Sequence, residues 1–257
     1  MIAGERATLA VLDSSGRLLP GATVEIPGSE KITTDDTGRG TFIAPFQPGT
    51  MTAHLANNIT FTATIISAPA APAQKPTAGA LAPAAHILLP RIIALGDRLA
   101  LEGAGFRGDA QLDHVALGDQ PALVLAASSV ALVALPNPRT PLGKTQLTIE
   151  VEGRNLVRTQ VTVVALVVAG PPKALAAGKR GTLTIEVNGT AERVAVEVRN
   201  LSPEVIRFPR GNVAEVKTSG GAPNIAKIEL TGAQSGDYAV SARLASSVAG
   251  TTVAGAP

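Results

Sequence analysis

The chain has 257 residues and a net charge of +2, with no Cys or Trp, one Tyr and three His. The absence of Cys excludes disulfides, thiolate nucleophiles, iron–sulfur clusters and Cys-type zinc sites, and the scattered Lys and Arg residues are not the clustered footprint of a nucleic-acid-binding protein. Since 45% of the residues are hydrophobic and only 2% are aromatic, we expect folded modules with thin cores of Val, Leu and Ile.

The sequence has no apolar run of membrane-spanning length. Its longest runs are residues 122–127, 130–135 and 161–169, all well below the roughly 18 residues that a spanning helix needs. Residues 1–6 lead directly into a predicted strand, without the basic and apolar regions of a signal peptide. A removed signal, another export route and retention in the cell all stay open, and we expect no membrane insertion.

Strand-like runs recur throughout the chain at roughly 8–12-residue intervals, and helical periodicity is weak. Residues 182–187 alternate so that Leu183, Ile185 and Val187 share one face, and residues 193–198 and 227–230 follow the same pattern. This alternation is typical of half-buried antiparallel strands. We therefore predict an all-β protein of three tandem β-sandwich modules, each immunoglobulin-like or transthyretin-like.

The first predicted module spans residues 1–67. Its turns at residues 13–16 and 34–40 contain Asp residues that can cap their own backbone. The order of its turn and strand residues resembles the carboxypeptidase regulatory-like (transthyretin-like) domain, although Pro20 directly precedes Gly21 and two additional residues precede Phe42. The matching residues are Gly16, Pro20, Gly21, Ala22, Val24, Thr34, Gly38 and Phe42. The resemblance implies a β-sandwich that assists or connects other domains and does not catalyse.

Residues 68–86 are predicted to be a linker. The segment APAAPAQKPTAGALAPAA has Pro at positions 69, 72, 76 and 83, and a chain of this composition forms neither a strand ladder nor a stable helix. We expect an extended spacer that leaves the first module on a flexible tether.

The second predicted module spans residues 87–169. Its glycine-rich turn Gly103-Ala104-Gly105-Phe106 resembles that of an IPT/TIG domain, which has an immunoglobulin-like fold. Further matching residues, in order, are Pro90, Ile92, Gly96, Leu99, Ala100, Leu101, Val115, Ala116, Leu117, Gly118, Pro136 and Gly143. We expect Phe106 to plug one end of the sandwich. A phosphate-binding loop is disfavoured, because the following helix and the Lys-Ser/Thr pair are missing.

The third predicted module spans residues 170–247 and follows a short Pro-containing joint at residues 170–173. Such a joint limits the angle between its neighbours, so we expect the last two modules to be stiffly coupled. Residues 177–185 are similar in sequence to residues 95–101. Residues 232–240 resemble the sequence with which bacterial immunoglobulin-like domains commonly end. Residues 248–257 are expected to be a tail that frays or leads into more chain.

No group of residues has the spacing of a metal site. His54, His86 and His114 are far apart in sequence. Asp13, Asp35 and Asp36 can be imagined around Ca²⁺ at one end of the first sandwich, but capping of their own turns is the simpler interpretation. The remaining acidic group is expected to be solvated in loops of the second module. Its members are Asp109, Asp113 and Asp119.

We expect no catalytic, cofactor or metal site and no enzymatic activity. Serine-nucleophile motifs and paired catalytic carboxylates are missing from the sequence. A basic patch on the third module is less favoured than a solvated strand face; its members are Arg193, Arg199, Arg207 and Arg210. At least half of the few aromatic residues should be in cores, which leaves glycan binding unsupported. They are Phe42, Phe46, Phe61, Phe106, Phe208 and Tyr238.

The module set and linker favour a non-enzymatic structural or interaction protein. The hypothesis is a component of a bacterial cell-surface or extracellular assembly that binds protein partners through strand edges and end loops. Copies of the chain itself are among those partners, because strand addition between copies builds filaments. Two alternatives stay open: a phage virion or tail-fibre accessory protein, and a ligand-binding accessory region of a larger secreted enzyme.

Overall fold

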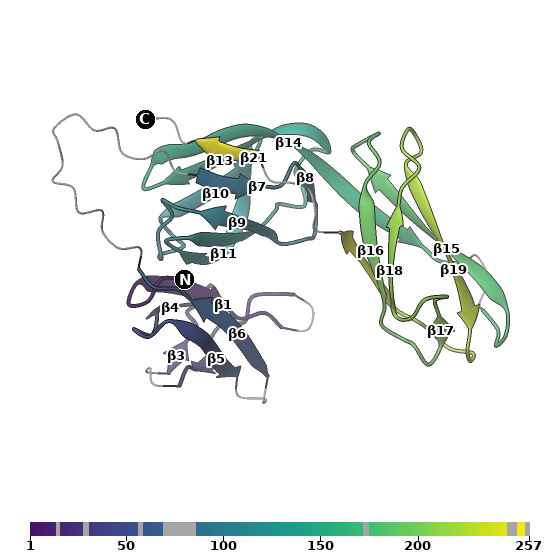
Figure 1. The fold of residues 1–257 in the computed structure, drawn as a ribbon, viewed down its shortest axis with the longest axis horizontal. Coiled ribbons are helices and arrows are strands. Elements are labelled where there is room, and N and C mark those ends of the chain that lie inside the picture. The colour runs from purple at the N-terminus through teal and green to yellow at the C-terminus, as the bar shows by residue number, and fades with distance from the viewer. Residues whose placement is uncertain are drawn as a thin grey trace.

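The computed structural model describes residues 1–13, 16–27, 31–55, 59–68, 86–171, 175–245 and 251–254. This part of the chain contains strands and turns and no helix, so the predicted all-β class is confirmed. It therefore holds no helix that is long and apolar enough to cross a membrane. The strands form three two-layered sandwiches, with the second in contact with both others (Figure 1).

The first sandwich encloses a core of short aliphatic side chains with Phe42 and Met51. One layer is formed by β1 (Arg6–Ala10) and β4 (Arg39–Ile43). The other layer has the order β3 (Ile32–Thr33), β2 (Thr23–Glu25), β5 (Gly49–Leu55), β6 (Thr60–Ile65).

The second sandwich is built around the largest core cluster, in which the predicted plug Phe106 is 2% exposed. Its first layer has the order β8 (Ile92–Ala94), β14 (Arg154–Ala169), β13 (Gly143–Val151), β10 (Asp113–Leu117), β11 (Gln120–Ser128). A bulge between Val124 and Ala126 lets β11 change layers. The second layer continues from β11 through β12 (Ala131–Leu135) and β9 (Leu99–Gly103) to β7 (His86–Leu89).

The third sandwich confirms the predicted alternation of residues 182–187, because Leu183, Ile185 and Val187 are all buried in its core. One layer continues from β14 through β15 (Arg180–Asn188) and β19 (Ile225–Gly232) to β17 (Ile206–Arg207). The other has the order β18 (Val213–Lys217), β16 (Ala195–Asn200), β20 (Val240–Leu244).

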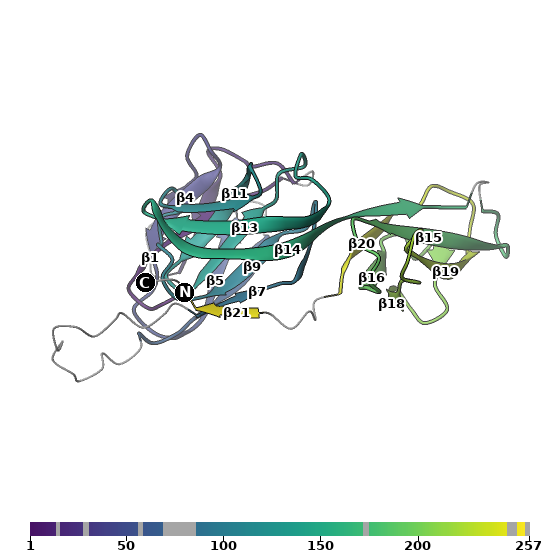
Figure 2. The same ribbon diagram turned by 90° about the horizontal axis from the view of Figure 1, so that it is seen from above.

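Strand β14 belongs to both the second and the third sandwich (Figure 2). Its first part pairs with β13 as far as Val163, and its last five residues pair with β15. Adjacent strand residues point to opposite faces, so Val163 enters the second core and Val164 enters the third. The coupling expected from the Pro-containing joint thus has another physical basis: one hydrogen-bonded strand crosses the boundary before the joint begins.

The first sandwich docks directly on the second, which differs from the expected flexible tether. Strand β1 pairs with β11 at Thr8 and Ala127. The Thr8 hydroxyl donates a hydrogen bond to the Gly108 carbonyl oxygen at 2.7 Å and accepts one from the Ala110 N–H at 3.3 Å. A Cβ on Gly108 would lie 1.7 Å from the Arg6 carbonyl oxygen, so the two backbones touch. The sequence of the predicted linker does not indicate this contact. Residues 69–85 of that linker lie outside the described part of the chain.

A further strand, β21 (Thr251–Ala254), lies within the expected tail. It pairs antiparallel with β7, from Thr251 opposite Leu89 to Ala254 opposite His86 (Figures 1 and 2). The segment that follows the third sandwich therefore returns to the second. Other residues of the expected tail, 248–250 and 255–257, lie outside the described part of the chain.

The close approach at the β14 crossing predicts a position-specific cost for Gly189→Ala. Gly189 has φ +101°, and an added Cβ would lie 2.4 Å from the Val163 carbonyl oxygen. Gly211 has the same φ of +101° but no atom within 4 Å of an added Cβ. We expect Gly211→Ala to lower the free energy of unfolding by about 1–2 kcal/mol, and Gly189→Ala by at least about 1 kcal/mol more. Urea unfolding followed by circular dichroism measures both, and equal losses would contradict the steric argument.

The Gly108 contact predicts that Gly108→Ala separates the first two sandwiches. Because the chain has no Cys, spin labels on Thr62→Cys and Asp119→Cys report one distance between them. We expect a narrow distance distribution in the parent chain and a broad one after Gly108→Ala. Gly236→Ala is the control, since its Cβ would meet nothing closer than 3.6 Å. A narrow distribution in both variants would show that docking does not need this close approach.

Candidate functional site

The three histidines do not come together. His54 on β5 and His114 on β10 are exposed on different sandwiches, and His86 lies in β7. Among the residues that the structure describes, no group of three or more His, Asp or Glu side chains is placed to hold a metal ion.

Turn capping is confirmed for Asp35 and Asp13 of the first sandwich, but no capping bond supports it for Asp36. Asp35 accepts hydrogen bonds from the Thr37 N–H at 2.8 Å, the Thr37 hydroxyl at 2.6 Å and the Arg39 N–H at 3.1 Å. The Thr37 hydroxyl is the largest cause that lowers the pKa of Asp35. Asp13 accepts a hydrogen bond from the Arg17 N–H at 2.9 Å, and Asp36 is exposed.

The expected loop solvation is wrong for Asp113, which is 1% exposed. Its two carboxylate oxygens accept hydrogen bonds from the Arg107 N–H at 3.0 and 3.2 Å. Burial raises the pKa of Asp113 to about 6, against the lowering effect of those bonds. Asp119 is exposed, as expected, and Asp109 accepts a hydrogen bond from the Gln111 N–H and lies 3.8 Å from the Arg6 guanidinium. A local signal was available for the burial of Asp113, because alternation in β10 places position 113 on the same face as the buried residues Val115 and Leu117.

The four arginines of the third module are all exposed, as a solvated strand face predicts. They do not form one patch, because Arg199 lies on β16 and Arg207 on β17, which belong to opposite layers. Arg193 is held by a hydrogen bond from its Nε to the Ser219 carbonyl oxygen at 3.1 Å.

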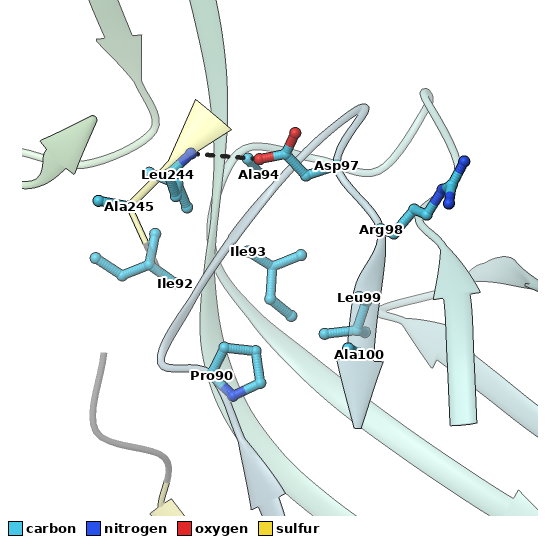
Figure 3. Close-up of a pocket in the computed structure, with 10 residues that line it drawn as sticks. All are labelled: Pro90, Ile92, Ile93, Ala94, Asp97, Arg98, Leu99, Ala100, Leu244 and Ala245. Atoms are coloured by element: carbon cyan, nitrogen blue, oxygen red, sulfur yellow. Dashed lines mark hydrogen bonds between the residues drawn. The ribbon is translucent and has the colours of Figure 1, made fainter. Parts of the chain in front are cut away.

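A pocket of about 380 Å³ lies where the second and third sandwiches meet (Figure 3). Its wall is mostly aliphatic, and Arg98 points away from the other labelled side chains. Asp97 accepts a hydrogen bond from the Leu244 N–H at 3.4 Å across the joint, and burial raises the pKa of its carboxyl group. The pocket therefore belongs to the joint, with its one carboxylate already bound to the third sandwich.

A larger groove of about 810 Å³ lies beside β4 on the first sandwich. Its wall is formed by β3, β4 and the segment that follows β4. Phe46 is 81% exposed there and Ile43 is 49% exposed. The groove is lined by Pro27, Lys31, Ile32, Thr33, Thr41, Phe42, Ile43, Ala44, Pro45, Phe46 and Gln47.

One edge of β4 has no strand partner among the described residues, since β4 pairs only with β1. Two hydrogen bonds flank the pairing of β1 with β4. At one end the Ala44 N–H donates to the Glu5 carbonyl oxygen, and at the other end the Val11 N–H donates to the Gly38 carbonyl oxygen. Because bonded residues alternate along an antiparallel pair, the N–H and C=O groups of Thr41 and Ile43 face away from β1.

The Phe46 ring lies over the backbone of Gly4. A Cβ on Gly4, which has φ +75°, would come within 2.9 Å of the Phe46 Cε1 atom. Part of the ring thus packs against the Gly4 backbone, while most of the side-chain surface is exposed. Three other aromatic residues, Phe42, Phe106 and Phe208, are buried as expected. The exposure of Phe46 could have been predicted from its position between Pro45 and Pro48, since flanking prolines keep a residue out of a central strand.

No family model matches this chain, and no curated protein matches it in sequence. One similar solved structure is SGBP-B of the Bacteroides ovatus mixed-linkage glucan utilization locus, in complex with a heptasaccharide. It shares 11% identity over 95% of this chain and 72% of its own, with a TM-score of 0.31. Invasin, a bacterial integrin-binding protein, shares 15% identity over 94% of this chain and 54% of its own, with a TM-score of 0.23.

PorU from Porphyromonas gingivalis shares 14% identity over all of this chain and 31% of its own, with a TM-score of 0.24. The chain thus spans about half of invasin and less than a third of PorU. Likeness at this level carries no conclusion about activity, substrate or partner, which leaves the geometry as the basis for a functional proposal.

The buried carboxylate of Asp113 predicts a pH-dependent stability. Its pKa in the fold, about 6, lies above the ordinary value of 3.8, so the folded state binds the proton more tightly than the unfolded state. The stabilisation is complete below the ordinary pKa and is lost as the pH rises through 6. We expect the free energy of unfolding to increase by roughly 2 kcal/mol from pH 7.5 to pH 4.5.

Asp113→Asn, which does not ionise, should remove most of this slope. Urea unfolding at a series of pH values measures it in both chains. An unchanged slope in Asp113→Asn would assign the effect to other groups, such as Asp97.

Proposed function

We propose that this protein is a non-enzymatic interaction protein, a stiff array of three sandwiches within a bacterial cell-surface or extracellular assembly. One observation carries the proposal: β14 runs through two sandwiches, so backbone hydrogen bonds connect one core to the next. A continuous strand fixes the distance and direction between the sandwiches, which is what a spacer or display scaffold needs.

The residues that line the groove beside β4 and the joint pocket support a binding role over a catalytic one. Among the described residues that line the groove, Lys31 is the one ionisable side chain, and it is paired with Glu25 at 2.5 Å. Of the described residues that line the joint pocket, two are ionisable: Asp97, whose carboxylate accepts a hydrogen bond from the Leu244 N–H, and Arg98, which points away from the other labelled side chains in Figure 3. General acid–base catalysis needs positioned groups with matched pKa values, whereas protein binding needs exposed apolar surface and free strand edges.

Two alternatives remain within the same architecture. A phage virion or tail-fibre accessory protein also benefits from a stiff sandwich array, and the genes beside its own would then encode virion components. An accessory region of a larger secreted enzyme would bind the substrate of a neighbouring catalytic domain, and the isolated chain would then bind that ligand. The resemblances of the first two modules to carboxypeptidase regulatory-like and IPT/TIG domains are part of this proposal, since such domains connect and bind.

The stiff-array proposal predicts one narrow distance between the second and third sandwiches. Spin labels on Glu102→Cys and Lys217→Cys, both exposed, span the joint. A pair within the third sandwich, Lys217→Cys and Lys227→Cys, is the control for the width that a single rigid body gives. We expect the two distributions to have similar widths. A distribution several times broader across the joint would contradict a stiff array.

A further inference from the structure

We propose that the β4 groove binds an extended strand of another protein chain, which adds to the free edge of β4 and places uncharged apolar side chains in the groove. This inference rests on the proposed interaction function and names the chemistry of the partner. Three features of the first sandwich support it: the backbone of β4, the side chains of the groove, and the sheet to which β4 belongs.

The backbone of β4 offers a repeated set of hydrogen-bonding groups. Thr41 and Ile43 both direct their N–H and C=O groups away from β1, and they are two residues apart. This separation is about 7 Å along a strand, the repeat at which a second strand presents its own outward groups. A peptide strand can satisfy all four groups in one register, because its own outward N–H and C=O groups recur at the same spacing. The ligand class that fits this edge is therefore an extended polypeptide.

The side chains of the groove favour apolar residues in the partner. Phe46 has by far the largest exposed fraction of the large hydrophobic residues described, at 81%, and Ile43 lies beside the same groove. Aromatic residues, Phe among them, are enriched at protein interfaces relative to the rest of the surface. Lys31 is already paired with Glu25, so the groove does not call for an acidic partner. Alternating apolar, uncharged side chains suit it best.

The sheet itself already grows by strand addition. In the order β4, β1, β11, β12, β9, β7, β21, strand β1 of the first sandwich joins the second sandwich at Thr8. At the opposite edge, β21 adds to β7. Both additions use the same ladder hydrogen bonds that β4 still offers on its free side. A partner strand at β4 occupies the next position in this sheet and is continuous with an interface that the fold contains.

The test is a selection of random nine-residue peptides displayed on phage against the full chain, followed by calorimetric titration with the selected peptides. We expect peptides with apolar residues at alternating positions. Phe46→Ala should weaken their binding at least tenfold, because it removes the supported ring. Leu201→Ala, at an exposed apolar residue of the third sandwich (54% exposed), is the matched control and should leave the affinity unchanged.

The backbone part is tested by a pair of substitutions at one position. Thr41→Pro removes the outward N–H without removing a backbone hydrogen bond to β1, a placement that edge strands tolerate, and should abolish binding. It also removes the 3.4 Å contact between the Thr41 and Thr8 hydroxyls, as does Thr41→Val, so the difference between these two variants reports the N–H. Thr41→Val keeps that N–H and should bind like the parent chain. N-methylated peptides test the same bonds without altering the protein: methylation at one set of alternate residues should abolish binding, and at the other set should be tolerated.

The outcomes separate the two proposals. Peptides whose affinity is unchanged by Phe46→Ala and insensitive to N-methylation would overturn the groove proposal and leave the interaction function standing. Phe46-dependent binding of glycans on an array, with no peptide selected, would also overturn it. If no peptide or glycan binds, and photo-crosslinkers placed on each sandwich give no adducts in intact source cells, the interaction function fails as well. A selected sequence that matches a segment of this chain would identify a second copy as the partner.

Discussion

The arrangement of the molecule depends on one strand that supplies two cores. Successive side chains of a strand point to opposite faces, and at the middle of β14 the opposite faces belong to different sandwiches, with Val163 in one core and Val164 in the next. Strand β8 runs parallel to it and does the same, because Ile93 enters the second core while Ile92 and Ala94 enter the third. Bending this joint would expose apolar side chains on both sides, so each core stabilises the angle between them.

The docking contact of the first sandwich lies next to a buried carboxylate on the second. Asp113 holds the Arg107 N–H, and this fixes the start of the loop that offers the Gly108 carbonyl oxygen and the Ala110 N–H to the Thr8 hydroxyl. An ionised carboxylate in a buried position lowers the free energy of unfolding at neutral pH. A backbone N–H left without an acceptor in the same place would lower it as well. The acid with the raised pKa therefore also supplies the acceptor for the first backbone N–H of the loop that contacts Thr8.

Free strand edges are the other recurring feature. Edges are where sheets accept further strands, and soluble proteins usually cover or interrupt them. Here the β7 edge is covered by β21 and the β11 edge by β1. Strand β4 keeps an uncovered edge among the described residues, beside a supported aromatic ring. Because β4 pairs with β1 and β1 pairs with β11, this edge belongs to the same sheet as the second layer of the second sandwich.

Features that depend on near neighbours along the chain were predictable from the sequence. Alternation in residues 182–187 predicted a strand with one buried face. The turn sequence around Asp35 predicted that its carboxylate caps the turn, and the glycine-rich turn before Phe106 predicted that this side chain is buried. Each of these signals lies within a few residues of its effect. Contacts between distant parts of the chain established that β14 is shared by two sandwiches, that residues 251–254 return to β7, and that the edge beside Phe46 stays open among the described residues. Period-two alternation tells which side chains share a face but not which sheet covers that face. Burial and edge pairing are set by strands distant in sequence, and those contacts exist only once the chain has folded.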